Sequence, residues 1–109
     1  FYGLESHNCG YVLYAMNTGE IMPEHVDHYE TYTKVFDINP EHIVRTVVFL
    51  DNWSPGHYFD IGGTTRLPWR PGDFCQWSPH TPHSASNIGT KTRYTLQITG
   101  VVHGKGLEV

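Results

Sequence analysis

Five residues of this chain have the types and spacing that metal and anion chemistry would need: His25, Asp27, His83, Arg93 and Thr95. His25 and Asp27 are two positions apart, and such residues on a strand project to the same side. His83 offers a second imidazole, and imidazole is the commonest metal ligand among side chains. Arg93 lies ten positions after His83 and offers a fixed positive charge for a carboxylate, while Thr95 adds a hydroxyl on the same strand face. The pattern predicts a metal ion beside an anion pocket.

The ligand set itself favours one metal. Two imidazoles and one carboxylate on one face of an ion leave the opposite positions open, which is the arrangement of non-haem Fe(II) oxygenases. The residues therefore indicate a mononuclear Fe(II) site that admits O2 at an open position.

Other residue pairs have a related spacing, namely His28 with Glu30 and, in reversed order, Glu5 with His7. His28 and Glu30 have the opposite strand parity, so they would face outward if His25 and Asp27 face inward. Gly19, six positions before His25, marks a turn that leads into the strand of His25. We therefore prefer His25 and Asp27 as the ligand pair.

Two histidines compete for the distal ligand position. His80 lies between Pro79 and Pro82, where a loop residue or a pocket wall is expected, whereas His83 precedes a strand-like segment. The spacing to Arg93 also favours His83.

Short segments with period-2 alternation dominate the chain. They are rich in β-branched and aromatic residues and span 11–16, 33–36, 45–50, 74–77 and 93–99. Turn signals separate them at 17–19, 39–40, 54–56, 62–63, 70–72 and 87–89. No long helical stripe occurs, so the pattern predicts an all-β sandwich, barrel or jelly roll.

Composition limits the partners and the location. A chain of 109 residues predicts one domain, and a net charge of -4 with seven Lys and Arg disfavours a nucleic-acid partner. No apolar run approaches the length of a membrane span, and the first residues do not have a signal-peptide pattern, so we expect a cytoplasmic protein without membrane contact. Because the chain starts at Phe1 rather than Met, we expect upstream residues to be missing. The oligomeric state stays open.

Several segments together resemble the core of the Fe(II)/2-oxoglutarate-dependent oxygenases, in their prolyl-hydroxylase-like branch. They are Gly19-Glu20-Ile21-Met22-Pro23-Glu24-His25-Val26-Asp27, Phe49-Leu50-Asp51-Asn52-Trp53, Gly62-Gly63, Pro71-Gly72-Asp73 and Arg93-Tyr94-Thr95-Leu96-Gln97-Ile98. The resemblance covers roughly residues 11–100, and the order and spacing of these segments are more specific than any one of them.

The resemblance implies a double-stranded β-helix, which is a jelly roll or cupin-like barrel, over a single domain of residues 1–109. It implies Fe(II) bound by the catalytic residues His25, Asp27 and His83, and 2-oxoglutarate whose distal carboxylate binds Arg93 with Thr95. Tyr14 is the candidate for the strand tyrosine that family members often add at that carboxylate. Decarboxylation of 2-oxoglutarate would then be coupled to hydroxylation of a small-molecule or peptidyl substrate, with ascorbate as reductant.

Two features concern the surroundings of such a site. The family usually packs helices outside its core, and little of this sequence can supply them. Five aromatic residues are candidates for the pocket wall: Trp53, Tyr58, Phe59, Trp69 and Trp77.

Two other readings stay open. Gly19, His25 and Glu30 resemble the first cupin motif, and Gly72, Pro79, His83 and Asn87 resemble the second. A cupin can be a dioxygenase, an isomerase or a binder without 2-oxoglutarate, but its first motif normally has a His where Asp27 stands. It also leaves Arg93 and Thr95 without a function. A non-catalytic jelly-roll binding module is the second alternative, and it would leave all these residues unrelated.

Overall fold

The computed structural model describes residues 9–29, 33–35, 39–78 and 80–101. Within this part of the chain the strands are β1 (Gly10–Met16), β2 (Ile21–His25), β3 (Ile43–Phe49), β4 (His57–Ile61), β5 (Thr64–Thr65), β6 (Phe74–Trp77), β7 (His83–Asn87) and β8 (Arg93–Val101). A 3-10 helix, η1 (Pro40–His42), precedes β3. Within the described ranges, no helix has the length and apolar character that crossing a membrane requires.

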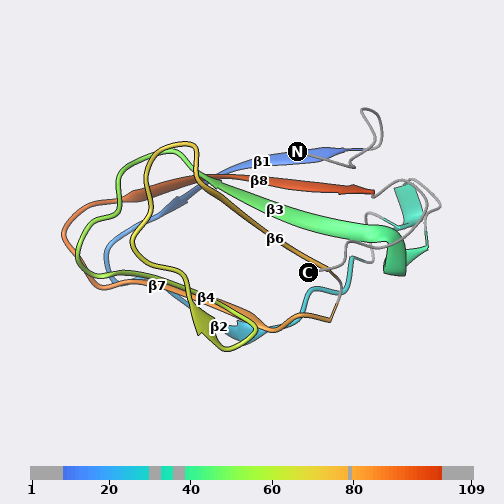
Figure 1. The fold of residues 1–109 in the computed structure, drawn as a ribbon, viewed down its shortest axis with the longest axis horizontal. Helices are drawn as coiled ribbons and strands as arrows, with labels where there is room; N and C mark the ends of the chain where they lie inside the picture. Colours follow the sequence, from blue (N-terminus) through green and yellow to red (C-terminus); the bar gives the residue numbers. More distant parts are fainter. Residues whose placement is uncertain (1–8, 30–32, 36–38, 79, 102–109) are drawn as a thin grey trace.

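The strands form two four-stranded antiparallel sheets that face each other as two layers (Figure 1). The first sheet has the order β1-β8-β3-β6 and the second has the order β2-β7-β4-β5. The chain passes repeatedly from one sheet to the other, so strands distant in sequence become neighbours in both layers. This architecture confirms the predicted all-β double-stranded β-helix.

Apolar side chains between the two sheets form the core. Phe49 of β3 stacks on Trp69 with ring centroids 4.0 Å apart, and Phe59 of β4 meets Phe49 edge-on at 5.7 Å. Aromatic pairs in these geometries contribute about 0.5–1.5 kcal/mol each beyond the area that they bury. This packing joins β3 of one sheet to β4 of the other and so fixes the spacing of the layers.

The turn from β7 to β8 passes very close to the turn before β4. Gly56 has φ +96°, and a Cβ added there would lie 2.2 Å from the backbone nitrogen of Gly89. The backbone nitrogen of Ile88 donates a hydrogen bond to the carbonyl of Gly56 at 2.9 Å. Only glycine fits both sides of this crossing, which holds the β7–β8 turn against the turn before β4.

Asn87, the last residue of β7, is fully buried beneath the same turn. Its side-chain amide donates to the carbonyl oxygens of Met16 and Lys91 at 2.9 and 2.8 Å, and its Oδ1 accepts from the Gly89 nitrogen. Asn87 therefore ties the end of β1 to the β7–β8 turn. Its position in the second cupin-like motif has a structural explanation.

The strand pattern was predicted correctly at 11–16, 74–77 and 93–99, and 45–50 overlaps β3. The predicted strand at 33–36 is wrong, since residues 33–35 are helical and the Thr33 nitrogen donates to the Tyr29 carbonyl at 3.0 Å. Phe36 lies outside the described residues. His83 begins β7 rather than preceding a strand, because the alternating serines of His83–Asn87 give only a weak strand signal.

A candidate metal centre beside an anion cavity

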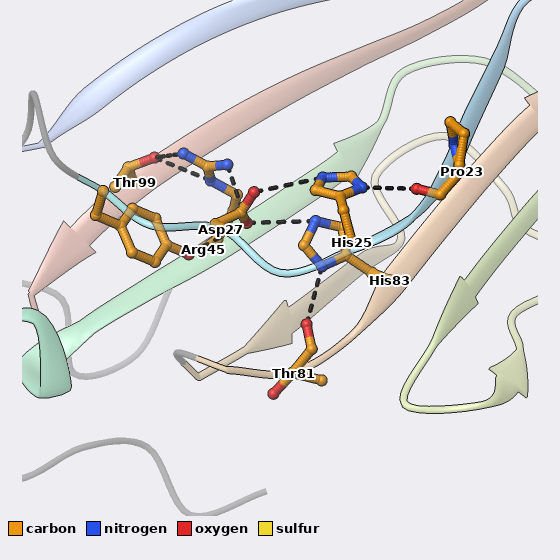
Figure 2. Close-up of polar contacts among 8 residues, drawn as sticks. Pro23, His25, Asp27, Arg45, Thr81, His83 and Thr99 are labelled. Atoms are coloured by element: carbon orange, nitrogen blue, oxygen red, sulfur yellow. Dashed lines mark hydrogen bonds and ion pairs between the residues drawn. The ribbon is translucent and has the colours of Figure 1, made fainter.

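His25, Asp27 and His83 lie together, with one ligand atom of each within 4.8 Å of the others. The Nε2 atom of His25 is 3.5 Å from Asp27 Oδ1, and the Nε2 atom of His83 is 3.3 Å from Asp27 Oδ2 (Figure 2). The two histidines are directly opposite each other in the β2–β7 ladder, and their ring centroids are 4.3 Å apart. Among the described residues this is the one group of three such side chains with metal-binding spacing.

Backbone carbonyls orient both imidazoles. The Nδ1 atom of His25 lies 2.8 Å from the Pro23 carbonyl, and the Nδ1 atom of His83 lies 3.0 Å from the Thr81 carbonyl. An Nδ1–H that donates to a carbonyl leaves the Nε2 lone pair free, and metal-binding histidines are commonly fixed in this way. Both Nε2 atoms face Asp27 (Figure 2), so the donor set fits a divalent transition-metal ion.

Asp27 is not on a strand, and this corrects the geometry expected from the spacing. The strand β2 ends at His25, and its ladder with β7 already shifts register between Met22 and His25. The backbone then turns away, with φ +57° at Tyr29. Asp27 reaches the histidines from the loop after β2, so strand parity is not what aligns it.

The competing residues lie elsewhere or outside the described ranges. His28 is exposed, and His80 is an exposed turn residue with φ 68°. Glu30 and the pair Glu5 and His7 lie outside the described residues.

The three side chains perturb one another electrostatically. Burial by itself would raise the pKa of Asp27, but the hydrogen bond with His83 and the charges of Arg45, His83 and His25 lower it to about 2. Burial acts to lower the pKa of His83, yet its hydrogen bonds to Asp27 and to the Thr81 carbonyl raise that pKa overall. The carboxylate is therefore ionised at neutral pH, as a metal ligand must be.

A cavity of about 270 Å³ extends from the three residues into the barrel. Its lining includes the three candidate ligands, two arginines, and Tyr14, Thr95 and Gln97; its apolar wall is Val12, Met22, Val47, Phe59, Trp77 and Ala85. Phe59 and Trp77 thus lie on the wall as expected from the sequence. Trp53, Tyr58 and Trp69 do not line this cavity, and Trp69 is part of the core stack with Phe49.

Arg93 is a buried cation without an acidic partner among the described residues. Its side chain lies in β8 with only 3% of its surface exposed, and Nη1 donates to the Tyr58 carbonyl at 3.3 Å. The guanidinium carbon lies 5.6 Å from the centre of the Phe59 ring, and the Nε atom has no partner. Burial lowers the pKa of Arg93 to about 10, although Tyr14 acts to raise it.

Thr95 and Tyr14 complete this end of the cavity. Thr95 is two residues after Arg93, and Tyr14 of β1 is directly opposite Thr95 in the β1–β8 ladder. The structure therefore brings the three residues predicted to bind a carboxylate to one side of the cavity. A buried, unpaired guanidinium is costly unless a bound anion compensates it.

Trp77 adds a second unsatisfied donor. Its indole Nε1 has no partner, its side chain is 3% exposed, and its ring centroid lies 4.7 Å from that of His83. Both unsatisfied buried groups on the cavity wall, Arg93 Nε and Trp77 Nε1, are hydrogen-bond donors. Such a cavity suits a ligand rich in acceptor oxygens.

Arg45 is a residue of this site that the sequence motifs did not predict. This residue lies in β3 and its Nη1 atom is 3.1 Å from Asp27 Oδ2 (Figure 2). A signal for it was present: Arg45 is the one charged residue in the strand Ile43–Phe49, whose other positions are all buried. A charge in such a strand needs a partner, but the sequence did not show which residue that is.

No protein-family model matches this chain, and no curated protein sequence matches it. Solved structures do match. The cupin domain of Schizosaccharomyces pombe Cnp3 has a TM-score of 0.59 at 13% identity, over 89% of this chain and 58% of that one. KdgF from Halomonas sp. has a TM-score of 0.59 at 14% identity, over 88% of this chain and 71% of that one. A predicted oxalate decarboxylase from Thermotoga maritima has a TM-score of 0.57 at 16% identity, over 84% of this chain and 65% of that one.

These likenesses concern the fold. The chain spans less than two thirds of the length of the Cnp3 cupin domain and of the Thermotoga protein. With its two antiparallel sheets and these neighbours, the chain has the double-stranded β-helix fold of the cupins, with a His-Asp-His group suited to a metal inside its barrel.

Proposed function

We propose that the protein is an Fe(II)- and 2-oxoglutarate-dependent oxygenase that hydroxylates a small-molecule or peptidyl substrate. The observation that carries the proposal is the buried guanidinium of Arg93, which has no acidic partner among the described residues and lies in the same cavity as His25, Asp27 and His83. A ligand with a carboxylate at one end and metal-binding oxygens at the other would satisfy both features.

In this function His25, Asp27 and His83 would hold Fe(II), which supplies O2 activation coupled to decarboxylation of 2-oxoglutarate. Arg93 would bind the distal carboxylate through its guanidinium, and Thr95 and Tyr14 would add hydroxyl donors to the same group. The aromatic wall of Phe59 and Trp77 would exclude water from the reacting end, since both side chains are at most 5% exposed. Ascorbate would serve as the external reductant.

A second candidate is a cupin-type metal-dependent dioxygenase or isomerase that does not use 2-oxoglutarate. It is favoured by the solved structures that resemble the chain, among them KdgF and a predicted oxalate decarboxylase. These neighbours support a cupin-fold metalloprotein more directly than they support 2-oxoglutarate chemistry. Arg93 would then bind a carboxylate of the substrate itself.

An anaerobic titration separates the candidates. Purified protein with Fe(II) and 2-oxoglutarate should develop a visible metal-to-ligand charge-transfer band that neither component gives alone. Glutarate is the matched control, because it has both carboxylates but lacks the keto oxygen that completes the chelate. Metal binding without a 2-oxoglutarate-dependent band would support the cupin-type function. Absence of metal binding would support a non-catalytic jelly-roll binding module.

A further inference from the structure

We infer that Arg45 is a positioning residue that holds the Asp27 carboxylate in the orientation in which it faces both histidines. The inference builds on the proposed metal centre and assigns a function to a residue outside its ligand set.

Asp27 needs such support because the sheet does not supply it. The residue lies in the loop after β2 and has no partner in the β2–β7 ladder, in contrast to His25 and His83. Its side chain is nevertheless only 12% exposed and lies within 3.5 Å of both imidazoles. Its orientation must therefore come from side-chain contacts.

Arg45 is anchored in the opposite sheet, where β3 has a neighbour on each side. Its Nε and Nη2 atoms both donate to Thr99 Oγ1, at 3.2 and 3.1 Å, and Thr99 faces Arg45 across the β3–β8 ladder. Its guanidinium carbon lies 4.9 Å from the centre of the Tyr29 ring. With one edge bound to Thr99, the guanidinium directs Nη1 to Asp27 (Figure 2).

Two donors that are not candidate metal ligands contact the same carboxylate oxygen. Arg45 Nη1 lies 3.1 Å from Asp27 Oδ2, and the Tyr29 hydroxyl donates to that oxygen at 3.4 Å. Rotation of the carboxylate would break both contacts, so its plane is fixed while Oδ1 faces His25. Arg45 is the one Lys or Arg that pairs with Asp27 among the described residues.

The test measures Co(II) binding to the full chain without oxygen, by affinity and by ligand-field absorption, which reports coordination geometry. Arg45→Met and Arg45→Lys should each weaken Co(II) binding on the order of 10- to 100-fold, as loss of a residue that orients a ligand commonly does, and should alter the spectrum. Lysine keeps the charge but cannot bridge Thr99 and Asp27 with a planar fork. Arg66→Met is the matched control, because Arg66 is exposed and does not line the cavity.

The Asp27→Ala background shows whether Arg45 acts through Asp27. In that background Arg45→Met should cause no further loss of affinity. Equal losses with and without Asp27, or a lysine variant identical to the wild type in affinity and spectrum, would overturn the inference.

Thr99→Val provides a test if Arg45→Met fails to fold, because it keeps the arginine and removes only its anchor. It should weaken Co(II) binding several-fold, and wild-type affinity in this variant would contradict the inference. A wild type that binds no metal would overturn the proposed function and this inference together. A wild type that binds Co(II) while every Arg45 and Thr99 variant binds equally well would overturn this inference alone.

Discussion

In each imidazole of the candidate metal centre, Nδ1 faces a nearby backbone carbonyl and Nε2 faces Asp27. The carbonyls of Pro23 and Thr81 lie two residues before His25 and His83, so this orientation is local. Residue types and their order in the chain therefore indicated the three candidate ligands, although the strand geometry expected for Asp27 from its spacing was wrong. They could not predict the contact of Arg45 with Asp27, because it depends on how two sheets face each other.

At the residue scale we expect His25→Ala to reduce metal affinity by at least about 100-fold, since it removes one of three ligands. His28→Ala is the matched control, because His28 is exposed three positions later and should leave the affinity unchanged. Calorimetric titration with Fe(II) or Co(II) measures both variants. A loss of affinity in His28→Ala but not in His25→Ala would show that the ligand pair is wrongly assigned.

Arg93→Met should weaken 2-oxoglutarate binding by about 10- to 100-fold, because a hydrogen bond to a charged group contributes about 1.5–3 kcal/mol. Metal affinity should not change, since Arg93 does not contact His25, Asp27 or His83 in the described structure. The charge-transfer band titrated with 2-oxoglutarate reports the first effect, and Co(II) titration reports the second. Unchanged 2-oxoglutarate affinity would remove Arg93 from the carboxylate site.

At the scale of elements, alternation of apolar and polar residues identified the strands of the first sheet better than those of the second. Strands β1, β6 and β8 were found because they are rich in aromatic or branched aliphatic residues. For β7 the sequence indicates only a strand-like segment after His83, since its outward positions are serines. Strand β5 has two residues and exists only through its pairing with β4, so the sequence did not predict it. The loop position of Asp27 was also missed, because a register shift and a positive φ leave no clear signal in the sequence.

The close backbone contact of Gly56 with Gly89 should contribute to the stability of the fold. Gly56→Ala should destabilise the fold by at least about 3 kcal/mol, since the added Cβ meets backbone and not a movable side chain. Gly63→Ala is the control: its φ of +81° is also left-handed, but nothing lies within 4 Å of its Cβ, so about 1 kcal/mol is expected. Urea unfolding measures both. An equal decrease in the free energy of unfolding in the two variants would mean that the backbone at the crossing can move to accommodate the added Cβ.

At the scale of the whole molecule, the barrel brings together charges that neither sheet has by itself. The second sheet and its loop supply His25, Asp27 and His83, and the first sheet supplies Arg45 and Arg93. Frequent turns and short strands predicted an all-β sandwich, barrel or jelly roll, and the family resemblance implied the double-stranded β-helix that the structure shows. The sequence could not predict the cavity or its unsatisfied donors, which depend on how side chains from both sheets pack together.

The stability of the metal-free chain should depend on pH through this cluster. The pKa of Asp27 is lowered to about 2 on folding, so its contribution, about 2 kcal/mol, is present above about pH 4 and is lost as the pH falls toward 2. The pKa of His83 is raised, so its contribution is present below about pH 6.5 and is lost as the pH rises through the raised value. The cluster should therefore stabilise the metal-free chain most between about pH 4 and 6.5.

Thermal unfolding of the metal-free wild type and of Asp27→Asn across pH 2–9 measures this dependence. The difference in stability between the two should be largest in the mildly acidic range and should shrink on both sides. A difference that keeps growing from pH 6.5 to 9 would contradict the assigned pairing of Asp27 with His83.

The cavity is lined by residues of both sheets. A molecule that contacts Arg93 and the histidines at the same time therefore links the two sheets. At a concentration 100 times its Kd, a ligand adds about 2.7 kcal/mol to the stability of the state that binds it. Amide hydrogen exchange should then slow in β1 and β2, two edge strands, one from each sheet, that line the cavity. Protection confined to the loop after β2 would instead mean that the ligand touches only one layer. In this fold a bound ligand would therefore also stabilise the packing of one sheet against the other.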